Sequence, residues 1–401
     1  MTYGKYDIII IGAGASGMAA ASAALTRNPS LHILLLEKKE VPGKKLSAAG
    51  NGRCNITNKA CPDYPDTEKF LRENGIYLRE EEEGRMYPYS GRGGQVTASF
   101  TRKIQRMGAE ILCGETVLAV ETVPGGGFSA ETASGHSFLS KILILACGGK
   151  AAPQYGTSGD GFVWAKKLGH RVSRLAPVLT PLVLERYPGK VLHGVRAKAD
   201  AVILKNGKPL AAERGEIQFT EEGISGIAVF NLSRYVKLES GENPREGMRK
   251  YEIQLDFFPE LTVSDLVSLL TERAADGIRK GELLCTLTDD RLAEAVLRSM
   301  GEEDFSLTQM ASCLKEFRFR VSNTGGWKAA QCTAGGVLLS EVHPETFASE
   351  RHCGLYFAGE ILDYDGPCGG YNLNHAWRTG RKAGSAAAEL LCIESAESEQ
   401  Q

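Results

Sequence analysis

A short glycine-rich turn near the N-terminus constrains this chain more than any other part of its sequence. The β-branched run at residues 8–11 predicts a buried strand, and the Ala-rich stretch that follows to residue 25 predicts a helix. Between them, Gly12, Gly14 and Gly17 have the G-x-G-x-x-G spacing, which permits a sharp turn, close approach to a pyrophosphate and tight packing of helix on strand. We therefore expect an α/β fold that binds a dinucleotide.

An acidic residue at the end of the next predicted strand supports this interpretation. The apolar run at residues 31–36 is followed by Glu37, which comes twenty residues after Gly17. At this position a carboxylate can bind the ribose hydroxyls of an adenosine. A glycine-rich turn that binds no ligand is the alternative.

Length and composition bound the class of protein. The 401 residues allow two or three domains, and 42% hydrophobic with 24% charged residues is ordinary for a globular protein. A net charge of −2 gives no reason to expect nucleic acid or an anionic membrane surface as a partner. No apolar run approaches the roughly 20 residues that span a bilayer, so we expect a cytoplasmic protein.

The ten cysteines predict neither disulfides nor a metal site. They are scattered from Cys54 to Cys392, and no C-x-x-C pair occurs. The neighbours His352 and Cys353 have no second pair at zinc-finger spacing. We therefore expect reduced thiols and no metal ligands.

Two further glycine-rich segments are candidates for ligand contacts. Residues 37–58 read as a loop, and its basic side chains and glycine amides suit a diphosphate, which makes Lys45, Gly52, Arg53 and Asn55 candidates. The alternative is an exposed basic loop. The apolar strand predicted at residues 141–146 ends in a Cys-Gly-Gly turn at 147–149, where the backbone can again approach a ligand.

The middle of the chain changes character twice. Short β-like runs around Asn206 and Gly207 form a strong hairpin signal and predict an antiparallel barrel or sheet domain. Helical periodicity returns at residues 261–317, which predicts a small helical subdomain.

A second signature lies near the C-terminus. A short apolar strand at residues 355–358 ends at Gly359 and Glu360, and a glycine-rich start at 369–372 opens a helix. This combination suits FAD, because the carboxylate can bind the ribityl chain while the helix dipole faces the flavin. An NAD site has no use for such a second element.

The whole chain resembles the bacterial FAD-dependent oxidoreductases that include aminoacetone oxidases and 3-dehydro-bile acid reductases. The motifs that carry the resemblance run from one end of the chain to the other: G-A-G-A-S-G, G-N-G-R-C-N-I-T-N, G-T-S-G-D-G, G-E-I-Q-F-T-x-x-G-I-S-G, T-A-G-G-V and Y-F-A-G-E-I-L-D-x-D-G-x-x-G-G-Y-N-L. They are specific for the family and poorly specific for a substrate.

The resemblance implies three parts. A Rossmann-like FAD-binding domain would consist of two segments, residues 1–188 and 345–401. An inserted β-barrel-like domain would consist of residues 189–260 and 317–344, and a helical subdomain of residues 261–316.

The resemblance also implies site residues. The N-terminal glycines would hold the pyrophosphate, Glu37 the adenosine ribose, and Glu360 the ribityl chain. The predicted cofactor contacts are Gly12, Gly14, Ala15, Ser16, Gly17, Glu37, Lys38, Lys45, Gly52, Arg53, Cys54, Asn55, Val117, Gly148, Gly149, Gly359, Glu360, Gly370, Asn372 and Leu373. Three residues depart from the family pattern. Ala49 stands where a serine is common, and Asn51 where a glycine is common, although asparagine tolerates a left-handed backbone. Asn374 replaces a frequent glutamine near the flavin.

The expected chemistry is hydride transfer at the flavin. Arg53, Cys54, Tyr371 and His375 are predicted to polarise the substrate or tune the flavin, with a packing role as the alternative for each. A reductase would pass electrons from NAD(P)H to an activated alkene such as an unsaturated 3-keto steroid. An oxidase would pass them from a small amine such as aminoacetone to oxygen.

Three further expectations complete the interpretation. No second G-x-G-x-x-G marks a nicotinamide domain, so NAD(P)H would bind only transiently. The expected substrate is a small molecule, and the charge balance argues against a flavin-dependent RNA modifier. A flavin-binding sensor or interaction protein is the non-enzymatic alternative.

Overall fold

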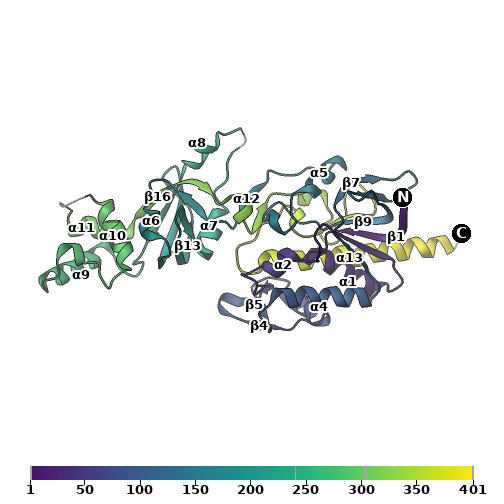
Figure 1. Cartoon of the computed structure of the whole chain (residues 1–401), viewed down its shortest axis with the longest axis horizontal. Coiled ribbons are helices and arrows are strands. Elements are labelled where there is room, and N and C mark those ends of the chain that lie inside the picture. The colour runs from purple at the N-terminus through teal and green to yellow at the C-terminus, as the bar shows by residue number, and fades with distance from the viewer. Residues whose placement is uncertain (1, 240, 302–304, 400–401) are drawn as a thin grey trace. The chain divides into compact units, whose positions relative to one another are not determined.

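The computed structural model describes residues 2–239, 241–301 and 305–399. They form two compact units (Figure 1). Unit 1 holds the described residues up to Ala176 and from Cys332 onward, and unit 2 runs from Pro177 to Gln331. The sequence-based ranges place the corresponding boundaries after residues 188 and 344. The predicted α/β fold with an inserted barrel and a helical region is confirmed.

Unit 1 is built on a mixed sheet whose parallel strands have the order β6-β2-β1-β9-β18. The first part of β9 also pairs with antiparallel β8, which pairs with β7. The strands are β1 (Thr2–Ile11), β2 (Ile33–Glu37), β6 (Glu110–Cys113), β7 (Val117–Thr122), β8 (Phe128–Thr132), β9 (Ser137–Leu145) and β18 (Leu355–Phe357).

Both faces of this sheet are covered, which explains the continuous apolar run in β1. Ile8 and Ile10 pack in a core with the helices α1 (Ala15–Arg27), α4 (Gly93–Arg106) and α13 (Tyr371–Glu399). Ile9 and Ile11 belong to a second core on the opposite face, with α5 (Asp160–Lys167). Alternate side chains of one strand therefore hold two helical layers together.

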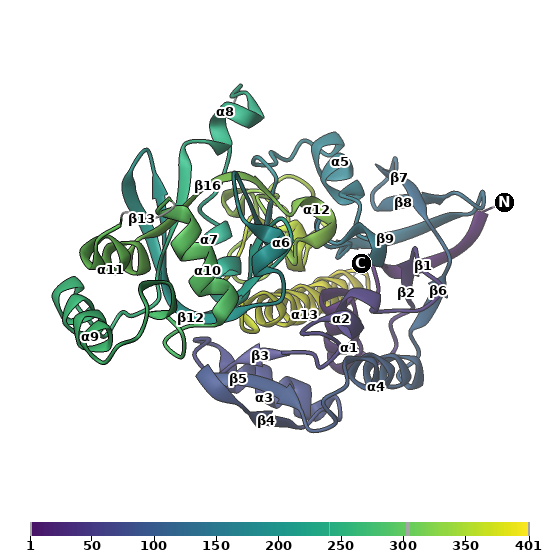
Figure 2. The same ribbon diagram turned by 60° about the vertical axis from the view of Figure 1, so that its left-hand side comes forward.

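Helices α1 and α13 lie side by side in both views (Figures 1 and 2). Small residues bring their backbones together. A Cβ atom at Gly380 would lie 2.2 Å from the carbonyl oxygen of Ser16, and one at Gly384 would lie 2.1 Å from that of Ala20. The two ends of the chain are joined along this seam.

A three-stranded antiparallel sheet, β3-β5-β4, is attached to the same core (Figure 2). Its buried residues include Ile56 and Met86. The elements of this region are α2 (Lys44–Ala48), β3 (Thr57–Asn58), α3 (Tyr64–Glu73), β4 (Leu78–Glu80), the 3₁₀ turn η1 (Glu82–Gly84) and β5 (Arg85–Pro88).

Unit 2 contains a closed barrel with the strand order β11-β14-β13-β12-β15-β16. Asn206 and Gly207 form the predicted hairpin turn between β12 and β13, with φ of +52° and +75°. The strands are β11 (Leu182–Leu184), β12 (Arg196–Lys205), β13 (Lys208–Phe219), β14 (Gly223–Ser225), β15 (Tyr251–Asp256) and β16 (Phe317–Thr324).

The predicted helical region of unit 2 is also present. Capping boxes at Thr262 and Ser306 satisfy the first amides of α9 and α11. The helices are α6 (Gly189–Leu192), α7 (Ile227–Ser233), α8 (Pro244–Met248), α9 (Val263–Ala275), α10 (Asp290–Ser299), α11 (Leu307–Lys315) and α12 (Gly326–Ala329). Short elements complete the chain: β10 (Ala176–Val178), β17 (Cys332–Ala334), η2 (Pro153–Tyr155), η3 (Lys280–Glu282), η4 (Leu339–Glu341) and η5 (Gly359–Ile361).

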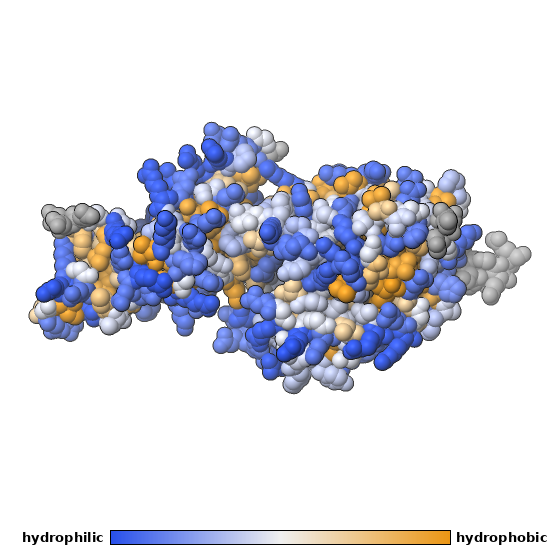
Figure 3. All heavy atoms as spheres, viewed as in Figure 1, coloured by the Kyte–Doolittle hydropathy of each residue, from blue (hydrophilic) through white to orange (hydrophobic). Residues whose placement is uncertain are grey.

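Hydrophilic side chains cover most of the surface drawn in Figure 3, with smaller hydrophobic groups among them. Among the described residues, no helix has both the length and the apolar character needed to cross a bilayer.

Candidate cofactor and active site

The candidate site lies at the carboxyl ends of the parallel strands of unit 1. β1 ends just before Gly12, β2 ends at Glu37, and β18 ends just before the turn that begins at Gly359. In open α/β sheets, ligands bind outside these strand ends, where the strand order reverses. The reversal here falls between β1 and β9. The topology thus brings together residues that the sequence analysis identified separately.

The N-terminal turn has the geometry that its glycines predict. Gly12 has a φ of +103°, and a Cβ atom there would lie 2.5 Å from the carbonyl oxygen of Ala146. A Cβ atom at Gly17 would lie 1.9 Å from the oxygen of Gly12, so helix and strand touch. Around Gly14, by contrast, no described heavy atom lies within 4 Å of the Cβ position. α1 begins at Ala15 with no side-chain cap, which leaves its first amides for an anion.

Glu37 is fixed at the end of β2 by two backbone amides. Its Oε2 accepts from Ala13 at 3.1 Å and its Oε1 from Lys39 at 2.9 Å. Burial raises the pKa of this carboxyl group, against the effect of these hydrogen bonds. The neighbouring Lys38 is directed to α5, where its Nζ pairs with Asp160 Oδ2 at 2.7 Å. Glu37 is therefore preorganised to accept further hydrogen bonds, and Lys38 is engaged by protein.

Lys45 and Glu360 form a half-buried ion pair that joins both ends of the chain. Lys45 Nζ lies 2.6 Å from Glu360 Oε2. Glu360 Oε1 accepts from the amide of Thr333 at 2.9 Å. The Thr333 hydroxyl accepts from the two amides after Gly149, at 2.8 and 3.0 Å. A Cβ atom at Gly149 would lie 2.4 Å from Thr333 Oγ1, so only glycine fits this network.

The turn η5 is held against the N-terminal turn and α13. Gly359 has a φ of +80°, and a Cβ atom there would lie 2.6 Å from Ser16 Oγ. The amide of Gly359 donates to Thr379 Oγ1 at 2.8 Å, and this hydroxyl donates to the carbonyl of His375 at 2.7 Å. Ser16 is buried beneath this contact. The two glycine-rich signatures are thus in direct contact.

The loop before α13 is organised by Asn372. Its side-chain oxygen accepts from the amide of Gly366 at 2.8 Å, and its nitrogen donates to the Gly366 carbonyl at 3.0 Å. Gly370 has a φ of +99°, and a Cβ atom there would lie 2.3 Å from the carbonyl of Thr57. Asn55 Oδ1, which lies 2.9 Å from that Cβ position, is buried and has no partner among the described residues.

The segment before Asn55 has the backbone that its composition predicts. Asn51 has a φ of +56°, the left-handed conformation expected where the family commonly has glycine. Gly52 has a φ of +82°, with no described heavy atom near its Cβ position. Cys54 is fully buried, and burial raises the pKa of its thiol to about 12. Its sulfur is therefore a neutral thiol at physiological pH.

Arg53 lies in the turn before Cys54, and its side chain packs against the small sheet. Its guanidinium pairs with Glu81, just after β4, at 2.5 Å and stacks over the ring of Tyr87 of β5, 4.4 Å from the ring centre. About half of its side chain is exposed. A contact of Arg53 with the cofactor stays a prediction.

Tyr371 and His375 lie one turn apart at the start of α13. Burial raises the pKa of the Tyr371 phenol, so it is protonated at neutral pH. His375 is buried, and burial lowers its pKa to about 3, so its ring is neutral. The His375 ring stacks on Tyr364 with centres 4.1 Å apart and forms a hydrogen bond with the backbone of Gly359. Its buried Nε2 has no partner among the described residues.

Three other predicted contacts occupy structural positions near these elements. Val117 is buried at the first position of β7. Gly148, after β9, has a φ of +74° and a Cβ position 3.0 Å from Thr157. Leu373 packs against the core beneath the start of α13.

Thr333, Thr379 and Tyr364 also contact residues of the candidate site, and none of them was predicted from the sequence. Thr333 opens the T-A-G-G-V motif, so its place in the family signature was visible although its role was not. Thr379 and Tyr364 contact the site only through the fold, because they bind Gly359 and His375 respectively.

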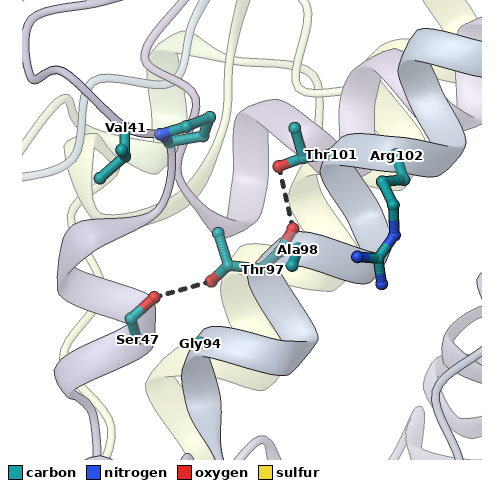
Figure 4. A pocket seen from close by; sticks show the side chains of 8 residues that line it. Val41, Ser47, Gly94, Thr97, Ala98, Thr101 and Arg102 are labelled. Carbon is teal, nitrogen blue, oxygen red and sulfur yellow. Dashed lines mark hydrogen bonds between the residues drawn. The ribbon is translucent and has the colours of Figure 1, made fainter.

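A separate cavity of about 330 Å³ opens between α2 and α4 (Figure 4). Its hydroxyl groups bind one another or the helix: Ser47 Oγ lies 3.0 Å from Thr97 Oγ1, and Thr101 donates to the Thr97 carbonyl at 2.9 Å. The lining residues are Val41, Pro42, Ser47, Gly94, Thr97, Ala98, Thr101 and Arg102. This cavity offers no acid or base other than a guanidinium. In the described parts of the chain, no cluster of His, Cys, Asp and Glu could hold a metal ion.

The HI0933-like protein Rossmann domain family matches residues 6–67 and 63–386 of this chain. The chain belongs to this family. The protein is an FAD-dependent oxidoreductase, and the predicted family is confirmed.

Two curated relatives match nearly the whole of this chain. The 3-dehydro-bile acid delta(4,6)-reductase of Clostridium scindens is 34% identical, over 95% of this chain and 98% of its own. The ribosomal RNA dihydrouridine synthase of Escherichia coli is 28% identical, over 98% and 99%. Among solved structures, a variant of the FrdA subunit of E. coli quinol fumarate reductase has a TM-score of 0.50, with 16% identity, over 97% of this chain and 70% of FrdA. This last similarity shows the shared fold.

The residues of the candidate site fit FAD. The open space at Gly14 and the uncapped start of α1 suit a pyrophosphate. The fixed carboxylate of Glu37 suits an adenosine ribose. The orphaned oxygen of Asn55, beside Gly370, is a buried acceptor that a bound ligand would satisfy. We therefore expect the cofactor to be held between the two glycine-rich signatures.

Proposed function

We propose that this protein reduces a carbon–carbon double bond conjugated to a carbonyl group, as in an unsaturated 3-keto steroid or bile acid. The observation that carries the proposal is the 34% identity, over 95% of the chain, to a relative named as a 3-dehydro-bile acid delta(4,6)-reductase. The name of the E. coli relative, dihydrouridine synthase, also describes the addition of two hydrogens to a double bond, and that similarity covers 98% of the chain.

FAD supplies hydride chemistry at its reactive ring nitrogen when it is bound. The side chains of the protein have to supply the proton that accompanies the hydride. Saturating a conjugated double bond takes a hydride at the carbon remote from the carbonyl and a proton at the adjacent carbon. The proton donor must therefore be protonated at neutral pH and lie beside the flavin site.

Tyr371 meets the first requirement. Its phenol is protonated because burial raises its pKa. It occupies the first position of α13, next to Gly370 and one residue before Asn372. We assign it the role of hydrogen-bond or proton donor to the substrate. His375 cannot donate as an imidazolium, since its pKa is about 3, and we assign it to holding η5 through Gly359.

A uracil ring is the second candidate substrate. It also carries a carbon–carbon double bond conjugated to a carbonyl, so the same hydride and proton transfer would serve it. The 28% identity over nearly the full length to an RNA-modifying relative favours its inclusion. NAD(P)H is the proposed electron donor for either substrate.

The test is anaerobic stopped-flow spectroscopy of the bound flavin. NADPH should bleach the flavin, and a 4-ene-3-keto steroid or a uridine-containing RNA should restore its colour with formation of the saturated product. Bleaching by amines and reoxidation only by oxygen would overturn the proposal in favour of an amine oxidase. A flavin that no donor reduces would favour a sensor.

The role of Tyr371 is tested by Tyr371→Phe. We expect flavin content and the rate of bleaching to stay at the wild-type level while reoxidation by the alkene slows by roughly 10²–10⁴-fold. Tyr235→Phe, at an exposed position of unit 2, is the matched control. Wild-type reoxidation in Tyr371→Phe would refute the assignment.

A further inference from the structure

The small sheet of unit 1 carries an exposed face of tyrosine and arginine side chains. This face, called here the Tyr–Arg face, consists of Tyr77, Arg79, Tyr87 and Tyr89 with Arg53. Tyr77 is 61% exposed and Tyr89 is 67% exposed, while the side chains of Arg79 and Arg53 are 46% and 47% exposed. Neither the cofactor site nor the core accounts for these side chains.

Strand register places these residues on one face. Arg79 is directly opposite Tyr87 in the β4–β5 pair, and the amide of Tyr89 donates to the carbonyl of Tyr77 at 3.1 Å. Side chains two residues apart in a strand, and those of directly paired residues, point to the same side. The alternate residues Met86 and Pro88 are buried on the other side of the sheet. The aromatic rings therefore form a row across two strands.

The face continues to the candidate flavin site. Asn58 of β3 pairs with Arg85 of β5, and the Asn58 side chain donates to the carbonyl of Gly369 at 2.9 Å. Gly369 precedes the first residue of α13, Tyr371, by two positions. From Arg85 to Tyr89 the strand extends about 13 Å, at roughly 3.3 Å per residue. A ligand laid along the face would thus reach the loop that opens α13.

The charges around this face nearly balance. Five cations, Arg53, Lys59, Arg79, Arg85 and Arg92, lie on or beside the hairpin that carries the four carboxylates of residues 80–83, which leaves a net charge of about +1. Arg53 and Arg79 share a single carboxylate, Glu81, at 2.5 and 3.6 Å. Arg92 follows Tyr89 by three residues, is exposed, and has no carboxylate partner in the described parts of the chain. Glu82 and Glu83 lie at the hairpin turn and pair with Arg85. Arg53 and Arg79 thus have one carboxylate between them, so part of their charge, together with that of Arg92, is left for a phosphate.

A row of exposed aromatic rings on an antiparallel sheet, with arginines beside it, is suited to unstacked nucleobases. Each base has a π face that stacks on tyrosine, and guanidinium groups bind the phosphates between bases. A protein partner would call for an apolar core around the rings. Here the neighbours of Tyr77 and Tyr89 are charged or small, such as Arg79, Ser90 and Gly91.

We infer that the Tyr–Arg face binds a single-stranded segment of RNA, with bases stacked on Tyr77 and Tyr89 and phosphates paired with Arg79 and Arg53. The inference rests on the proposed function, because a uracil held at the end of this face presents the conjugated double bond that the adjoining site would reduce. RNA would then be a macromolecular partner of this chain, contrary to the expectation drawn from its net charge.

The test is fluorescence anisotropy with a fluorescein-labelled 12-mer of oligouridylate, as a single strand and as a duplex with its complement. The holoenzyme should bind the single strand more tightly than the duplex. Tyr77→Ala/Tyr89→Ala should weaken binding by at least about tenfold, since each base–aromatic stack contributes on the order of a tenfold change or more. Flavin absorbance and reoxidation by a steroid should stay unchanged in this variant.

Tyr235→Ala is the control, because Tyr235 is an exposed tyrosine of unit 2. Equal loss in the control, equal binding of single strand and duplex, or no RNA binding by the flavin-loaded wild type would overturn the inference. Loss of steroid turnover with unchanged RNA affinity would also overturn it, since the face would then serve the small substrate. Failure of the proposed function is seen separately, as a reduced flavin that no conjugated alkene reoxidises.

Discussion

Because α1 and α13 are in close contact, we predict that a single added methyl group at their interface separates the two halves of the candidate cofactor site. A Cβ atom at Gly380 would lie 2.2 Å from the Ser16 carbonyl oxygen, about 1.2 Å short of the 3.4 Å at which ordinary contacts begin. The obstacle is backbone, which cannot rotate away. In Gly380→Ala the two helices must therefore move apart by about 1 Å.

The magnitude follows from two opposing terms. Overpacking against a rigid neighbour costs up to about 3 kcal/mol, and replacing glycine by alanine within a helix returns about 1 kcal/mol. The net loss of about 2 kcal/mol corresponds to a fall in the melting temperature of roughly 4–8 °C for a unit of this size. Ser16 also lies under Gly359, so the displacement should weaken FAD binding.

Differential scanning calorimetry and FAD titration of the apoprotein would measure both effects. Gly94→Ala in α4 is the control, because its Cβ would meet no heavy atom of the described residues within 4 Å. We expect the control to keep wild-type FAD affinity and to be at least as stable as the wild type. If Gly380→Ala melted and bound FAD as the wild type does, the close helix contact would not hold the site together.

Three further substitutions test individual side chains. The pKa of His375 is about 3 in the folded protein and about 6.5 in the unfolded chain, so the folded state binds fewer protons and loses about 2 kcal/mol of stability when the pH falls to 5. Urea unfolding at pH 7 and pH 5 should show that His375→Asn lacks this loss. A pH dependence of His375→Asn equal to that of the wild type would contradict the role of His375. Lys45→Met removes the cation that pairs with the Glu360 carboxylate and should lower the free energy of unfolding by about 1–2 kcal/mol, a value reduced because the pair is partly exposed to solvent. The double variant Lys45→Met/Glu360→Gln should recover part of this lost stability. Buried Glu341 pairs with two arginines, which lower its pKa to about 2, so the stability it contributes is present above about pH 4.5 and is lost as the pH falls toward 2. Glu341→Gln should therefore be less stable than the wild type at pH 7. A difference in stability between the two proteins that persists near pH 2 would argue against ionisation of Glu341 as the cause.

The N-terminal part of the site could be predicted because its chemistry is local. Gly12, Gly14, Gly17 and Glu37 lie within one strand–helix–strand unit, and their spacing predicts which of them turn, touch or bind. The structure gives Gly12 the predicted turn, Gly17 the predicted close contact and Glu37 its place at the end of β2, whereas their binding of a ligand stays a prediction. Asn51 likewise has the left-handed backbone expected from its residue type.

The remaining contacts depend on residues far apart in the sequence. Lys45 pairs with Glu360 across 315 positions, and Thr333 reaches the turn after Gly149 across more than 180. No periodicity or spacing encodes such partners, because they follow from the order of strands in the sheet. The motif T-A-G-G-V marked Thr333 as a family feature without indicating what it binds.

The candidate cofactor site and the Tyr–Arg face differ in how well they tolerate substitutions, and this difference bears on which substrate the protein binds. At Gly149, Gly359 and Gly370 a Cβ atom would collide with neighbouring atoms, so almost any substitution there disrupts the candidate cofactor site. Tyr77 and Tyr89 project into solvent, where replacement costs little stability. A change of substrate is therefore easier to accommodate on this exposed face than at the three glycines. On this argument the Tyr–Arg face, rather than the pocket, is the place where this chain would distinguish a nucleic acid from a steroid.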